Sequence, residues 1–174
     1  MKQLIIISFL FSTLFGQTNF VKGMEQYLNR AEGSSGMKAQ AGPINSAISL
    51  FESSLSENEE ESMLALLKCY YYKGKFVLTN VESKKSIFQK GKDLGESSIE
   101  KYPKSASLRY WYLANLGSWS EVYGILTAAK EGVSDIMKTQ AEEIISLDPY
   151  YWNGGGYFML GAVHFKSPYI PFIL

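Results

Sequence analysis

A helix, a proline stop and a new aromatic helix follow one another twice in this chain, and this pattern constrains the fold most. Residues 98–103 read Ser-Ile-Glu-Lys-Tyr-Pro, and the sequence Tyr-Trp-Tyr-Leu-Ala follows at 110–114. Residues 144–149 end in Leu-Asp-Pro, and Tyr-Phe-Met-Leu-Gly-Ala follows at 157–162. Pro103 and Pro149 are 46 residues apart. Because proline ends helices, a spacing of this order indicates stacked helical hairpins.

Apolar residues at helical spacing fill the rest of the chain as well, and we find no convincing strand. The expected helices cover residues 21–31, 43–55, 58–78, 82–102, 105–123, 125–147 and 155–166. Gly91 and Gly95 lie inside one of them, where they would let a neighbouring helix approach closely. The sequence therefore predicts an all-α fold of antiparallel helix-hairpin repeats, an α-solenoid.

Three of the expected helices share one register of bulky, bulky, small and variable positions. The register is Met63, Leu66, Leu67, Tyr70 in the first helix, Tyr110, Leu113, Ala114, Gly117 in the second, and Tyr157, Leu160, Gly161, His164 in the third. It resembles the tetratricopeptide repeat (TPR), whose first helix carries W-x2-L-G-x2-Y and whose second helix ends in proline. Leu160-Gly161 and Tyr70 match that consensus, whereas Gly117 and His164 depart from it.

A narrower resemblance covers residues 43–172. Residues 111–119, the turn at 147–156 and residues 160–168 are similar to the TPR family of the T-component of tripartite ATP-independent periplasmic (TRAP) transporters. The resemblance implies an exported protein that associates with a periplasmic solute-binding protein. This chain lacks the cysteine that anchors many members to lipid. Members continue into a further helix, so the resemblance also implies that the last hairpin is truncated.

The N-terminus resembles a secretory signal peptide. Lys2 precedes an apolar run over residues 4–15, and the small residue Gly16 follows it. The run is shorter than the roughly 20 residues that span a bilayer, so we expect no stable membrane span. We divide the chain into a signal peptide (1–16), an N-terminal segment and linker (17–42) and a helical repeat domain (43–174). Export to the periplasm or cell envelope of a bacterium follows from this division.

Charge and cysteine content exclude other classes of protein. The chain has 17 basic and 17 acidic residues, a formal net charge of zero, which argues against nucleic acid as a partner. Cys69 is the only cysteine, so no intrachain disulfide can form. We expect no cofactor and no metal, because the only histidine, His164, has no cluster of ligands around it.

Two motifs invite an enzymatic interpretation, and we favour a structural one for both. Gly154-Gly155-Gly156 precedes a helix but lacks the Lys-Ser or Lys-Thr of a phosphate-binding loop, so it is better explained as a turn. A dyad of Cys69 and His164 is conceivable, but nothing in the sequence brings the two together. We therefore predict that the protein is not an enzyme.

The TPR resemblance implies a concave groove lined by the first helix of each hairpin. At the corresponding offsets stand Leu64, Lys68, Tyr71, Tyr72, Trp111, Asn115, Ser118, Trp119, Phe158 and Phe165, with Ala162 and Lys166 beside them. Such an aromatic groove suits an apolar face of a protein, and Asn115 is expected to hold a ligand backbone. We predict an exported, non-enzymatic binding module with a protein partner. The alternative is a carrier that encloses a lipid-like or other apolar small molecule.

Overall fold

The computed structural model describes residues 18–166, and all regular elements in this range are helical. The eight α-helices are α2 (Asn19–Leu28), α3 (Ala41–Ser54), α4 (Glu59–Tyr72), α5 (Val81–Lys101), α6 (Ala106–Tyr123), α7 (Ile125–Lys130), α8 (Val133–Leu147) and α9 (Gly155–Lys166). Two short pieces extend them, the 3-10 turn η1 (Asn29–Ala31) and the π-helical turn η2 (Lys73–Val77). The predicted all-α class is confirmed. The predicted signal peptide, residues 1–16, lies outside the described residues.

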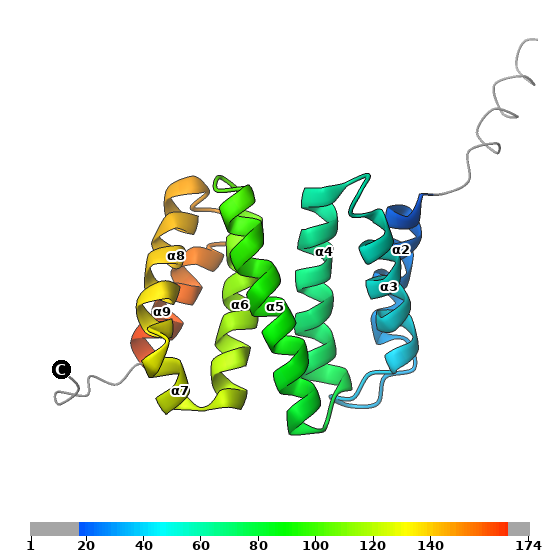
Figure 1. Cartoon of the computed structure of the whole chain (residues 1–174), viewed down its shortest axis with the longest axis horizontal. Coiled ribbons are helices and arrows are strands. Elements are labelled where there is room, and N and C mark those ends of the chain that lie inside the picture. The colour runs from blue at the N-terminus through cyan, green and yellow to red at the C-terminus, as the bar shows by residue number, and fades with distance from the viewer. Residues whose placement is uncertain (1–17, 167–174) are drawn as a thin grey trace, which may run out of the picture.

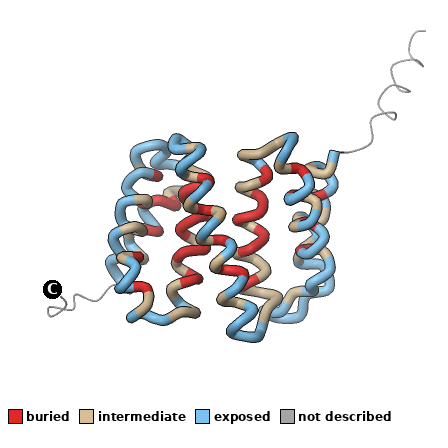
Figure 2. The backbone as a smooth tube through the Cα atoms, viewed as in Figure 1, coloured by how far each residue is buried: buried red, intermediate tan, exposed pale blue. Residues whose placement is uncertain are grey.

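The long helices run side by side in a row of antiparallel hairpins (Figure 1). The pair α2 and α3 stands at one end, α4, α5 and α6 occupy the middle, and α8 and α9 close the other end. Buried residues gather in the three middle helices (Figure 2). This arrangement is the repeat-like helical architecture that the proline spacing predicts.

The segment before residue 43 contributes a packed helix. In α2, Gly23 lies against the ring of Phe51, and the rings of Phe20 and Phe51 are 5.6 Å apart. Phe51 is fully buried in α3, so burial of this ring ties α2 to the row. The linker Gly33-Ser34-Ser35-Gly36 forms the turn that follows, with Gly33 and Gly36 at positive φ.

The middle of the molecule is held by an amide that lies between three helices. Asn115 of α6 is fully buried, and its Nδ2 donates to the carbonyl oxygens of Leu67 in α4 at 3.0 Å and of Trp111 at 2.8 Å. A Cβ at Gly91 of α5 would lie 2.2 Å from the Asn115 Oδ1. One at Gly95 would lie 2.3 Å from the Tyr112 ring. The two glycines therefore allow the close approach of α5 to α6 that the sequence predicts.

The predicted helix over residues 125–147 is interrupted. Gly132 adopts φ 64°, a left-handed conformation that ends α7 at Lys130 and lets α8 start at Val133. Asn58 and Ser105 precede α4 and α6, where such residues commonly cap a helix, but neither side chain makes a capping hydrogen bond. Among the described helices, none has the length and apolar character needed to cross a membrane.

Gly95→Ala tests the close packing of α5 on α6. The added methyl group would overlap the Tyr112 ring, so we expect the free energy of unfolding to fall by about 1–3 kcal/mol. Gly161→Ala in α9 is the matched control, because nothing lies within 4 Å of its Cβ position. Because alanine favours the helix more than glycine does, the free energy of unfolding of this control should stay unchanged or rise by up to about 1 kcal/mol. Equal destabilisation of both variants in denaturant titrations would contradict the packing described.

Candidate ligand-binding site

A hollow of about 840 Å³ opens beside α6, on the face that points away from Asn115. We call it the α6 pocket. Its floor is α6, where Ala114 and Gly117 leave space, and its walls come from α7, α8 and α9. Val133 and Met137 of α8 and Met159 of α9 are among the apolar residues that line it. Most of the exposed surface in the pocket is apolar, and the volume lies within the range of small-molecule sites in proteins.

Aromatic rings form one end of the pocket. Tyr71 of α4 and Trp111 of α6 meet edge to face with centroids 5.7 Å apart. Trp152 comes from the loop before α9. The centroid of its ring lies 5.7 Å from that of Trp111, which it meets edge to face, and 6.1 Å from that of Tyr110, on which it stacks. These four rings line the pocket together. Rings arranged in this way bury a large apolar area at low cost in side-chain entropy.

The loop that presents Trp152 has an unusual backbone. Trp152 and Asn153 have φ values of 49° and 55°, and Gly154 follows at 83°. A bulky residue rarely adopts positive φ, and such strain persists only where surrounding contacts impose it. Here Gly155 and Gly156 pack tightly against Tyr110 and α8, where a Cβ would lie within 3 Å of a neighbouring side chain. The triple glycine therefore serves as a close-packed turn, and it leaves Trp152 59% exposed at the mouth of the pocket.

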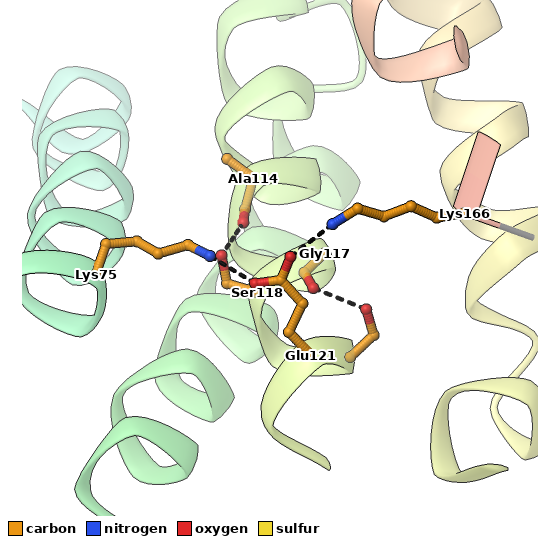
Figure 3. A network of polar contacts seen from close by, with 7 residues as sticks. Lys75, Ala114, Gly117, Ser118, Glu121 and Lys166 are labelled. Carbon is orange, nitrogen blue, oxygen red and sulfur yellow. Dashed lines mark hydrogen bonds and ion pairs between the residues drawn. The ribbon is translucent and has the colours of Figure 1, made fainter. Parts of the chain in front are cut away.

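Polar side chains gather at the opposite end of the pocket (Figure 3). The carboxylate of Glu121 in α6 accepts from the Lys75 Nζ at 2.6 Å and from the Lys166 Nζ at 2.7 Å. Burial opposes ionisation of Glu121, but the hydrogen bonds from Lys166 and Lys75 outweigh it, so the pKa of the carboxyl is lowered. Ser118 also lines this part and donates to the Ala114 carbonyl oxygen at 2.8 Å. Two ammonium groups thus share one carboxylate at the rim.

The structure brings together some of the residues predicted to line a groove. Those that line the α6 pocket are Tyr71, Trp111, Ser118, Phe158, Ala162 and Lys166. Lys68 lies next to it, with its Nζ 5.8 Å from the centroid of the Trp111 ring, and burial lowers its pKa. Leu64 is half-buried on α4 and Phe165 is exposed on α9; neither lines the pocket.

Three further predicted positions face other parts of the molecule. Asn115 bonds to the backbone of α4 and α6, so its amide is unavailable to a ligand backbone. Trp119 is buried, and its Nε1 donates to the Gln89 side chain of α5 at 2.7 Å. Tyr72 donates its hydroxyl to the Arg30 carbonyl oxygen at 3.0 Å, on the side of α4 that faces α2. On α6, Asn115 and Trp119 lie on the face that packs against α4 and α5, and this face is opposite the one that lines the pocket.

Lys75 and Glu121, which the groove offsets did not include, had a detectable signal in their spacing to each other and to Lys166. Lys75, Glu121 and Lys166 are separated by 46 and 45 residues, the same spacing as the two helix-ending prolines. Equivalent positions in stacked hairpins lie next to one another, so this spacing indicates contact. Val133 and Met137 also line the pocket, but no spacing in the sequence indicates this, because their positions depend on the break between α7 and α8 at Gly132.

The residues considered for catalysis lie apart. Cys69 is buried in α4, and burial raises the pKa of its thiol to about 12, so the thiol stays protonated near neutral pH. His164 is exposed on α9, a helix that makes no contact with α4. Within residues 18–166 no cluster of three or more histidine, cysteine or carboxylate side chains could hold a metal.

Fold and pocket together define an all-α protein of stacked helical hairpins with an apolar hollow beside α6. A family model described as regulator of microtubule dynamics protein 1-3 matches residues 26–168. The match covers most of the chain, which therefore belongs to this family. No match to the chain was found among curated proteins.

The family match overturns the resemblance to the TPR and to the TRAP transporter T-component. The similarity rested on apolar and small residues at helical spacing and on prolines at helix ends. Any stack of antiparallel helical hairpins needs such residues to bury its faces, so they indicate the architecture without identifying the family. The expectation of a solute-binding protein as a partner rested on that resemblance, so it loses that support.

Proposed function

We propose that this protein is a non-enzymatic binding module that encloses an apolar small molecule in the α6 pocket. The observation that carries this proposal is the pocket itself, with about 840 Å³ of space, mostly apolar walls and a few polar groups at one end. Sites for small molecules commonly have this composition, in which apolar walls supply affinity and polar groups set orientation. The carrier considered as the alternative from the sequence is thus the better-supported function.

The aromatic end supports the same proposal. Trp152 is held at the mouth in a backbone conformation that costs free energy, and its ring is more than half exposed. A bound apolar molecule would cover this ring together with Phe158, which is 71% exposed in α9. Removing both surfaces from water would stabilise the complex through the hydrophobic effect.

Ala162→Trp tests the pocket by filling it. Ala162 lines the pocket from α9, so an indole there should displace the ligand and weaken binding of the neutral dye Nile red by tenfold or more. His164→Trp places the same indole on the same helix, at an exposed position outside the lining, and should bind the dye normally. Thermal unfolding of both variants confirms that each is folded. If the dye binds the two variants equally, or binds neither them nor the unchanged protein, the proposal is wrong.

A protein partner is the second candidate, and family membership favours it. The family is named for regulators of microtubule dynamics, and we propose association with microtubules as the corresponding role of this chain. The surface suited to such a contact is the outer face of α9, where Tyr157 and Phe165 are exposed and lie outside the pocket lining. Export to a bacterial envelope, as predicted from residues 1–16, would keep the protein away from microtubules. Export would therefore exclude the microtubule role and leave the α6 pocket proposal unaffected.

Co-sedimentation with polymerised tubulin tests this second candidate. We expect the protein to pellet with microtubules, and the double variant Tyr157→Ser/Phe165→Ser to pellet at least about threefold less, because both rings leave water on contact. Neither ring is part of the core, so the variant should remain folded. A protein that stays in the supernatant at every tubulin concentration has no such role.

A further inference from the structure

The polar end of the α6 pocket carries chemistry that the proposed apolar ligand does not by itself require. Lys75 and Lys166 come from different helices and converge on the single carboxylate of Glu121 (Figure 3). Two positive charges thus share one negative charge, which leaves a local excess of one positive charge at the rim. An ammonium group has three N–H donors, and the described residues supply one carboxylate partner to each of these two. Donors therefore remain for a second anion.

We propose that Lys75 and Lys166 bind the carboxylate of a medium-chain fatty acid whose acyl chain lies along α6 towards Trp152. The inference rests on the proposed function, since it adds a head group to the apolar ligand of the same pocket. The lysines already hold a carboxylate at 2.6 and 2.7 Å, so their arrangement suits this group. Glu121 acts as a resident substitute that keeps the two side chains in place when the pocket is empty.

The dimensions of the pocket agree with this occupant. Glu121 lies 11 residues after Tyr110 on α6, so the floor between them is about 16 Å long at a rise of 1.5 Å per residue. This length is comparable with an extended acyl chain of medium length. Between the polar and aromatic ends, Ala114, Val133 and Met159 offer apolar contacts. The carboxylate of such a ligand would thus lie at the two lysines, the middle of its acyl chain against the aliphatic side chains, and the end of the chain against the aromatic rings.

Substitutions at the rim separate head-group recognition from packing. Lys75→Ala/Lys166→Ala should weaken binding of laurate about tenfold, the change expected when a charge-assisted hydrogen bond is lost, and leave binding of dodecanol unchanged. Glu121→Gln should strengthen laurate binding, because it removes the competing carboxylate. If Glu121 were only structural, its loss would weaken binding instead. The exposed lysines Lys22 and Lys104 provide the control, since Lys22→Ala/Lys104→Ala changes the net charge equally.

The test is isothermal titration calorimetry of the full chain at low ionic strength with laurate, dodecanol and dodecyltrimethylammonium. We expect laurate to bind about tenfold more tightly than the other two. Equal affinity for all three would overturn the fatty-acid proposal and leave the apolar pocket standing. Binding of none of them would overturn both. A lysine variant that loses dodecanol and laurate equally would also contradict the head-group role.

Discussion

The buried amide of Asn115 is the interaction on which the rest of the structure depends. The NH2 group of a buried amide needs acceptors, and Nδ2 of Asn115 finds them in the carbonyl oxygens of Leu67 and Trp111, whereas Oδ1 has no hydrogen-bond partner among the described residues. Gly91 provides the space that its oxygen side occupies. These contacts fix α4, α5 and α6 relative to one another, and the large buried side chains Leu113, Leu116 and Trp119 then fill the space around them. Loss of the amide would leave a cavity between the helices, and a side chain in place of Gly91 would force α5 and α6 apart.

The pocket follows from the same constraint, because α6 uses two opposite faces. Tyr112, Asn115 and Trp119 recur at spacings of three and four residues and face α4 and α5. Ala114, Gly117 and Glu121 recur at the same spacings on the other side and face α8 and α9. Large residues on the first face hold the helix in place, while small residues on the second leave a hollow. The rigid centre therefore supports the floor of the site, and the terminal helices build its walls.

The sequence predicts the architecture well and the site only in part. Helical spacing and helix-ending prolines report local structure, so the helices and the close approach at Gly91 and Gly95 could be predicted. The aromatic positions Tyr71 and Trp111 were found because repeated hairpins place equivalent residues on one surface. Asn115 and Trp119 were assigned to the same surface, but a shift of one position along a helix turns a side chain by about 100°.

Other parts of the site depend on tertiary structure that spacing alone does not reveal. Gly132 could be tolerated inside a helix or end one, and only the packing of α7 and α8 decides between these outcomes. The positive φ of Trp152 likewise depends on the tight contacts of Gly155. The ion pairs of Glu121 could in principle be predicted from the sequence, since both lysines lie one repeat away from it. Family membership could not be read from the pattern, because apolar spacing is a requirement of stacking.

Hydrogen exchange measured by mass spectrometry, with and without laurate, tests the central claim that a rigid centre supports a ligand site between α6, α8 and α9. The account predicts that amides in α4, α5 and the buried face of α6 exchange slowest in both conditions. Laurate should add protection in α8, in α9 and in residues 148–154, and change α2 and α3 little. Protection gained mainly in α2 and α3, or a centre that exchanges as fast as the terminal helices, would contradict it.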